Sequence, residues 1–133
     1  MTPTLMPSSL TALVVEDDEI NREVAQELLE QLGVQHVHLA EDGMQGLRKL
    51  RTLGQVDLVL VDIYMPDMDG IEFIGKLAEL RFKGKVIIVS GVSIETLALA
   101  QQLAQEGGIQ VVAAMEKPLR MDELARAIGL NAA

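Results

Sequence analysis

The sequence predicts an α/β protein with a doubly wound, five-stranded parallel sheet and five helices. Short apolar runs rich in β-branched residues alternate along the chain with longer segments whose apolar residues recur at helical spacing. The run Leu58–Val61 is apolar throughout, which is typical of a strand buried on both faces of a parallel sheet. Because crossovers between parallel strands are right-handed, the helices are expected to cover both faces of the sheet.

Length and composition favour one soluble domain. The chain has 133 residues, 49% of them hydrophobic, and no cysteine. A net charge of −9 and only three aromatic residues argue against a nucleic-acid-binding surface. No apolar run is long enough to cross a membrane, and the start lacks the features of a signal peptide, so we expect a cytoplasmic protein. Residues 1–9 are predicted to be a flexible lead to a domain over residues 10–133.

The first three predicted elements are a strand, a helix and a second strand. Leu10–Val15 is apolar and ends in acidic residues, which indicates a buried strand. The helix after this strand is expected to end at Gly33, and Val34–Ala40 is expected to form a short strand. The helix is predicted from apolar residues recurring every four positions: Ile20, Val24, Leu28 and Leu32.

The next helix is expected to run from Met44 to about Leu53, although Gly46 inside it costs about 1 kcal/mol relative to alanine. After the buried strand, Asp69 can cap a third helix that turns four residues inward: Ile71, Ile74, Leu77 and Ala78. The remaining predicted elements are a strand at 85–89, a helix at 94–106, a strand at 111–115 and a last helix. That helix buries Met121, Leu124, Ala125 and Ile128.

Polar residues follow four of the predicted strands at one edge of the sheet. Glu16 and Asp17 follow the first strand, Asp62 ends the third, and Ser90 and Lys117 follow the fourth and fifth. Open α/β sheets bind their ligands at this carboxyl edge. Three acids converging there call for a cation, and oxygen ligands alone suit a hard ion such as Mg²⁺.

The same residues suggest phosphoryl chemistry. Lys117 can bind a phosphoryl group as a point charge, and the Ser90 hydroxyl can donate a hydrogen bond to a phosphoryl oxygen. With a metal ion beside them, Asp62 is then placed to act as a nucleophile toward phosphorus. A structural ion pair between Asp62 and Lys117 is the alternative, but it leaves the other polar residues unexplained.

These motifs resemble the receiver domain of response regulators in bacterial two-component signalling. The resemblance spans roughly residues 10–130 and rests on four motifs in order: Val14–Asp18, Asp62–Gly70, Ser90-Gly91 and Glu116–Pro118. It implies a flavodoxin-like, chemotaxis-regulator-like fold with strand order 2-1-3-4-5. It also implies a phosphorelay function in which a histidine kinase or a histidine phosphotransfer protein is the partner.

The resemblance also implies residue roles. Asp62 is the phosphoacceptor, Lys117 binds the phosphoryl group, and Ser90 is the switch hydroxyl. Mg²⁺, or Mn²⁺ in its place, is implied to be held by Asp17, by Glu16 through water, by Asp62 and by the backbone carbonyl of Tyr64. The bond between Lys117 and its following proline is normally cis in this family. Such a domain catalyses only its own phosphorylation and dephosphorylation, so we do not expect an enzyme.

The chain departs from the family pattern at several positions. Ala114 stands where the family commonly has an aromatic switch residue, and Glu16 replaces the commoner aspartate. Tyr64 and Val92 occupy positions that tune hydrolysis of the phosphoaspartate in this family. Bulk and apolarity there can exclude water, so a slowly decaying phosphorylated state is predicted.

The predicted helix at 94–106 has apolar residues around more than half of its circumference. Alanine and leucine are good helix formers, which is one explanation. The other is that the helix, the fifth strand and the last helix form an output face over residues 94–130, for a downstream protein, an output domain or a homodimer. The sequence leaves both explanations open.

The remaining polar residues have simpler explanations. His36 and His38 share one face of a probable edge strand, but a metal site there lacks a third ligand. Asp18 and Asp69 are expected to cap helices, and Asp67 to lie in a turn.

Three other functions are compatible with a fold of this class. A pseudo-receiver would keep the fold and bind partners without phosphorylation. An aspartate-nucleophile phosphatase would need a second acid two residues after Asp62, where the chain has Tyr64. A flavin-binding protein would need a phosphate-binding loop after the first strand, where the chain has acids. The segment Met115–Leu119 is also similar to receivers that precede cyclic-di-nucleotide phosphodiesterase domains.

Overall fold

The computed structural model describes residues 10–65, 68–91 and 94–129, and the predicted lead at residues 1–9 lies outside them. Five strands alternate with five helices along the described chain. In order they are β1 (Thr11–Val15), α1 (Glu19–Gln31), β2 (His36–Ala40), α2 (Gly43–Leu53), β3 (Leu58–Asp62), α3 (Gly70–Glu79), β4 (Lys85–Ser90), α4 (Ile94–Glu106), β5 (Gln110–Glu116) and α5 (Met121–Ala127).

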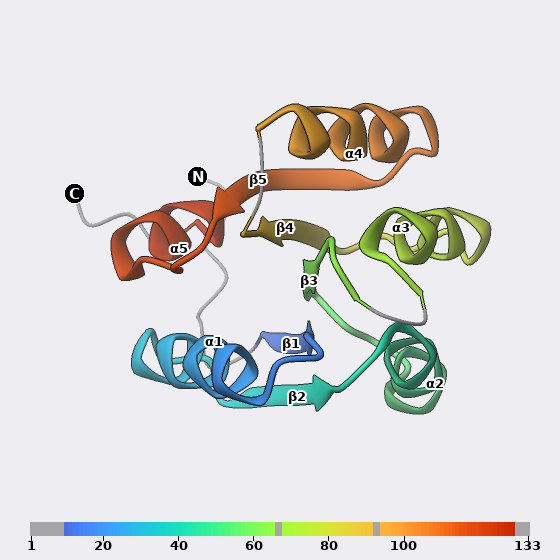
Figure 1. Ribbon diagram of the computed structural model, residues 1–133. Helices are drawn as coiled ribbons and strands as arrows, with labels where there is room; N and C mark the ends of the chain where they lie inside the picture. The colour runs from blue at the N-terminus through green and yellow to red at the C-terminus, as the bar shows by residue number, and fades with distance from the viewer. Residues whose placement is uncertain (1–9, 66–67, 92–93, 130–133) are drawn as a thin grey trace, which may run out of the picture.

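The strands form one sheet in the order β2-β1-β3-β4-β5, and every neighbouring pair is parallel (Figure 1). The predicted fold class and strand order are therefore confirmed. The register pairs Val15 with Val61 and Asp62 with Val89, so the carboxyl ends of the three central strands meet at one edge. All five residues of β3 are buried, as expected for a central strand of a parallel sheet.

Helices cover both faces of the sheet (Figure 1). One apolar cluster joins the sheet to α2, α3 and α4, and the other joins it to α1 and α5. This two-sided covering follows from right-handed crossovers on either side of the first strand.

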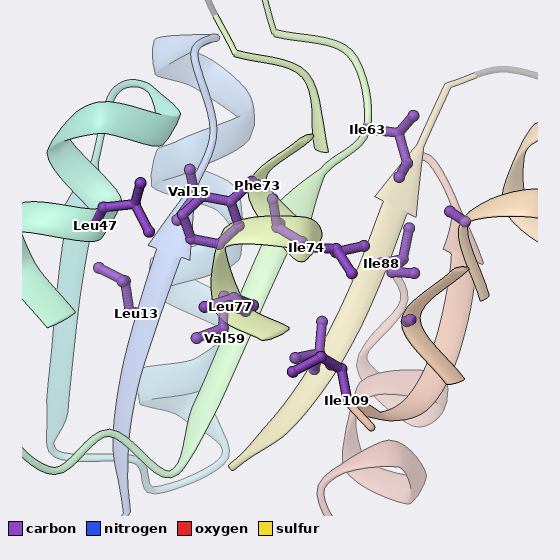
Figure 2. Packing of buried hydrophobic residues seen from close by; sticks show 14 of the residues in the cluster. Leu13, Val15, Leu47, Val59, Ile63, Phe73, Ile74, Leu77, Ile88 and Ile109 are labelled. Atoms are coloured by element: carbon purple, nitrogen blue, oxygen red, sulfur yellow. The ribbon is translucent and has the colours of Figure 1, made fainter. Parts of the chain in front are cut away.

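The larger cluster includes Phe73 of α3, which is fully buried and lies beside Val15 (Figure 2). Gly46 explains how this ring fits, because a Cβ atom at that position would lie 3.0 Å from both Phe73 Cε2 and Val15 Cγ2. The glycine that weakened the prediction of α2 thus permits close packing of that helix on the sheet.

The predicted inward face of α1 is partly wrong. Ala25 and Leu29 are its buried residues, whereas Ile20 is 71% exposed and Val24 is 39% exposed. Leu28 packs against the apolar cluster as expected. The inward face therefore starts only after the first turn of the helix, and two apolar side chains near its amino end are left in solvent.

Aspartates begin three of the helices. Asp18 accepts a hydrogen bond from the backbone N–H of Asn21 at 3.0 Å, and Asp69 accepts one from that of Glu72 at 2.8 Å. Both predicted caps are confirmed, and Asp42 plays the same part for α2. Asp67, the predicted turn residue, lies outside the described residues. No helix in the described ranges has the length and apolarity required to cross a bilayer.

Candidate functional site

Three carboxylates meet at the carboxyl edge of the sheet. Glu16 and Asp17 follow β1 directly, and Asp62 is the last residue of β3. One carboxylate oxygen from each lies within 4.8 Å of those of the other two. Glu16 and Asp62 are buried and Asp17 is exposed. The structure thus brings together the acids that the sequence predicted to converge.

Lys117 reaches into this cluster from the end of β5. Its Nζ donates to Glu16 Oε1 at 2.6 Å and to Asp62 Oδ2 at 3.1 Å. Its backbone N–H donates to Ser90 O at 2.8 Å, which ties the loop after β5 to the end of β4. The peptide bond to Pro118 is cis, as the family resemblance implied.

The crowding of charges shifts two pKa values. Burial raises the pKa of Glu16 to about 8, and the neighbouring Asp62 adds to that rise while Lys117 opposes it. Burial by itself lowers the pKa of Lys117, but its hydrogen bonds to Glu16 and Asp62 outweigh this and raise the pKa overall. The lysine is therefore firmly cationic, and one ammonium group does not balance the carboxylates around it.

One buried atom of the cluster has unused bonding capacity. Glu16 is 3% exposed, and its Oε2 has no hydrogen-bond partner among the described residues. A buried carboxylate oxygen without a partner is unfavourable, and a cation can satisfy it. The donor set of oxygens alone, with partly exposed access through Asp17, fits a hard divalent ion such as Mg²⁺.

The loop after β3 is held by backbone hydrogen bonds around the end of the strand. The Tyr64 N–H donates to Asp62 Oδ1 at 3.2 Å, and the Ile63 N–H donates to Val89 O at 3.0 Å. The Gly70 N–H then donates to Ile63 O at 2.8 Å and closes the loop. Asp62 is therefore fixed between two ordered backbone segments.

The other predicted site residues lie at the same edge. Ser90 is fully buried at the end of β4, beside the strand that carries Asp62. Tyr64, two residues after Asp62, is 52% exposed. Val92, the second position expected to tune hydrolysis, lies outside the described residues.

Sequence reasoning missed two residues of α1 that support the site. Arg22 Nη1 donates to Glu16 O at 2.9 Å and to Asp17 O at 3.4 Å, which holds the acidic loop in place. Asn21 lines a small cavity of about 100 Å³ together with Glu16, Asp62 and others. Neither has a sequence signal beyond its position just after the helix cap.

Two further sequence observations have structural outcomes. Ala114 lies half-buried in β5 opposite Ile88, with no aromatic ring at that position. His36 and His38 lie on β2, which is an edge strand as expected. Within the described ranges, the one group of three residues suited to a metal is the acidic cluster, so nothing completes a histidine site there.

The chain belongs to the response regulator receiver domain family, whose pattern matches residues 12–129. It is 39% identical over 130 residues to the sensor histidine kinase AruS of Pseudomonas aeruginosa, covering 96% of this chain but only 12% of that protein. It is also 32% identical to the two-component response regulator 24 of Arabidopsis thaliana, covering 92% of this chain and 84% of that protein. This is a domain that occurs both inside large kinases and nearly alone.

Solved structures agree with the family assignment. A response regulator receiver domain protein from Clostridium thermocellum superposes with a TM-score of 0.77 at 26% identity, covering 90% of each chain. A CheY-like receiver domain protein from Methanospirillum hungatei gives 0.75 at 31% identity, covering 90% of this chain and 91% of that one. A probable response regulator/GGDEF domain protein gives 0.79 at 25% identity, with 92% of this chain matching 48% of that one.

Proposed function

We propose that this receiver domain accepts a phosphoryl group on Asp62 in a Mg²⁺-dependent reaction and so switches a protein-interaction surface. The observation that supports it most is the buried cluster in which Lys117 contacts both Glu16 and Asp62 while Glu16 Oε2 has no hydrogen-bond partner in the part of the chain that the structure describes. A purely structural ion pair would not require the second buried acid. A pseudo-receiver that binds partners without phosphorylation is the alternative.

Asp17 and Asp62, with Glu16 through water, are the side chains that would hold the metal ion, and the Tyr64 carbonyl is the proposed backbone ligand. Bound there, Mg²⁺ or Mn²⁺ supplies charge neutralisation for a phosphoryl group in transfer. The grouping of the three carboxylates, with an oxygen of each within 4.8 Å of the others, and the lack of a described partner for Glu16 Oε2 support this assignment.

The protein's own groups perform the remaining steps. An Asp62 carboxylate oxygen attacks phosphorus of the donor's phosphohistidine, the new O–P bond forms, the N–P bond breaks, and the departing imidazole is protonated from solvent. Lys117 then exchanges a carboxylate contact for a phosphoryl oxygen, and the Ser90 hydroxyl can donate to another. The chain is thus a phosphoryl acceptor that acts on itself and is not an enzyme for separate substrates.

The donor is proposed to be a histidine kinase or a histidine phosphotransfer protein that shares the cytoplasm with this chain. Such a protein must bring its histidine to the carboxyl edge of the sheet, where Asp62 ends β3. Ile20 and Val24 offer it two exposed apolar side chains, and Val24 also lines the small cavity beside Asp62. Contact with the donor would bury these apolar side chains, which are exposed to water in the free domain, and would thereby stabilise the complex.

The output surface is proposed to be formed by α4, β5 and α5. Leu99 and Leu103 lie one helical turn apart on α4 and are 50% and 40% exposed, while Leu97 and Ala100 face the core. A downstream protein, an output domain or a second copy would bury them. Charge substitution at both leucines should abolish that association, and Met44→Glu, which alters an equally exposed apolar residue on α2, should not.

The first test is phosphorylation by acetyl phosphate with Mg²⁺, followed by intact mass. Wild type should gain one phosphoryl group only when Mg²⁺ is present, and Asp62→Asn should gain none. Asp57→Asn makes the same chemical change at the opposite end of β3 and should behave as wild type. Absence of both the adduct and Mg²⁺ binding would favour the pseudo-receiver.

The lifetime of the adduct is a second test. Tyr64 and Val92 are proposed to slow hydrolysis of the phosphoaspartate by limiting access of water. We expect the adduct to persist for far longer than seconds at neutral pH after removal of the donor, and replacement of Tyr64 by asparagine to shorten it. A half-life of seconds in wild type would contradict the proposal.

A further inference from the structure

A large cavity opens at the amino edge of the sheet, opposite the acidic site. It has a volume of about 930 Å³ and is reached between the starts of β3 and β4 and the ends of α2 and α3. That volume lies within the range of about 300–1,000 Å³ typical of small-molecule sites. Three residues of β3, 59–61, lie between Leu58 of the cavity lining and Asp62, which at about 3.3 Å per residue places them about 13 Å apart.

The lining of the cavity combines apolar and cationic side chains. The apolar residues come from both core clusters and from the surface, and the positive charges surround them. Of the 11 basic residues in the chain, four line this cavity, against one of the 20 acids, Asp57. The apolar side chains are Leu10, Leu50, Val56, Leu58, Leu80, Phe82 and Ile128, and the basic ones are Arg51, Arg81, Lys83 and Lys85.

This charge pattern runs against that of the whole protein. The chain carries a net charge of −9, yet this cavity of about 930 Å³ is bordered by cations. Asp57, whose Oδ2 accepts the backbone N–H of Thr11 at 2.9 Å, can offset only one of the four positive charges. A local positive potential over an apolar hollow selects ligands that carry negative charge.

The walls of the cavity are formed in advance of any ligand. The Lys85 N–H donates to Asp57 O at 2.9 Å, and the Asp57 N–H donates to Thr11 O at 2.8 Å. A Cβ atom on Gly84 would lie 2.8 Å from Asp57 O and 2.9 Å from Val56 O, so only glycine permits this close approach. Hydrogen-bonded backbone therefore fixes the floor, and little ordering is needed on binding.

We propose that this cavity binds an amphipathic organic anion from solution, an apolar ring or chain system that carries one carboxylate, sulfonate or phosphate. The apolar body contacts Leu80 and Phe82, and the anion pairs with Arg51 and Lys83 at the rim. The inference is independent of phosphorylation, because no residue of the acidic site takes part.

The test uses 8-anilinonaphthalene-1-sulfonate as probe and N-phenyl-1-naphthylamine, the same ring system without the sulfonate, as its neutral counterpart. Titration of the full ¹⁵N-labelled chain should shift the amide signals of Gly54 and Gly84, which line the cavity. By fluorescence, the sulfonate should bind at one site and at least tenfold more tightly than the neutral probe. Asp62→Asn should bind equally well, which separates this proposal from the proposed phosphorylation.

The variant Arg51→Glu/Lys83→Glu reverses two exposed charges at the rim and should weaken sulfonate binding at least tenfold. Arg48→Glu/Lys76→Glu makes the same charge change outside the cavity lining and should bind within twofold of wild type. Circular dichroism must show both variants folded.

The binding measurements would overturn the proposal in three cases. These cases are equal binding of the two probes, equal binding by the two variants, and amide shifts that lie away from the cavity. The last result would mean that the probe binds as an adventitious additive only. Nuclear Overhauser contacts in ligand-free protein between the cavity and residues 1–9, or with a second copy, would assign the cavity to those occupants and would also overturn it.

Discussion

Gly70 is the position where a single methyl group should disturb the fold and the candidate site together. It is buried as the first residue of α3, and a Cβ atom there would lie 2.6 Å from Ile63 Cα and 2.7 Å from Asp62 O. Both contacts are with backbone atoms, so no side chain can rotate away. The two segments must separate by about 0.4 Å or more before the methyl group fits, and overpacking of this kind costs about 1–3 kcal/mol.

We place Gly70→Ala at the upper end of that range, a loss of about 2–3 kcal/mol in the free energy of unfolding, because the clash is with rigid backbone. Gly75→Ala is the matched control, since it makes the same change within the same helix. A Cβ atom on Gly75 meets nothing within 4 Å. Because alanine has less backbone freedom than glycine in the unfolded chain, Gly75→Ala should raise the free energy of unfolding by about 0.5–1 kcal/mol.

Urea unfolding of both variants, followed by circular dichroism, measures this difference of about 3 kcal/mol between two identical substitutions. Because the displaced atoms belong to Asp62 and its neighbour, Gly70→Ala should also weaken Mg²⁺ binding, and Gly75→Ala should not. The reasoning would be refuted by a Gly70→Ala protein within about 0.5 kcal/mol of wild type, or by equal effects of the two variants.

Further predictions concern protonation, capping and packing. Because burial raises the folded pKa of Glu16 from 4.5 to about 8, its contribution to stability is fully present below pH 4.5 and is lost as pH rises through 8. In urea titrations, the free energy of unfolding of the metal-free protein should therefore fall between pH 6 and 8.5, and that of Glu16→Gln should fall less. Added Mg²⁺ should restore the stability of the wild type most at pH 8.5. Asp69→Ala removes the cap bond to Glu72 and should cost about 1 kcal/mol, which Asp69→Ser should largely recover. Leu29→Ala should lower the free energy of unfolding by about 2–5 kcal/mol, whereas Ile20→Ala, at an exposed position, should change it by no more than about 0.5 kcal/mol. Similar losses for the two variants in thermal unfolding would contradict the burial of Leu29 and the exposure of Ile20.

The sequence predicted most of the site because the site follows the ends of strands. A short apolar run such as Leu58–Val61, bounded by turn residues, favours a strand buried on both faces, and parallel strands bring their carboxyl ends to one edge. Glu16, Asp62 and Lys117 could thus be placed together from local patterns alone. The inward face of α1 was predicted less well, because spacing of four residues fits more than one stripe of a helix.

The sequence by itself determined the order and type of the elements and the residues that gather at the acidic edge, since periodicity and strand ends are local properties. Only the tertiary structure decided that Lys117 contacts both Glu16 and Asp62 and that Glu16 Oε2 is left without a described partner. It also gathered four cations around an apolar cavity at the other edge. Those features depend on residues far apart in the chain, whose distances, burial and shared charge exist only once the sheet has formed.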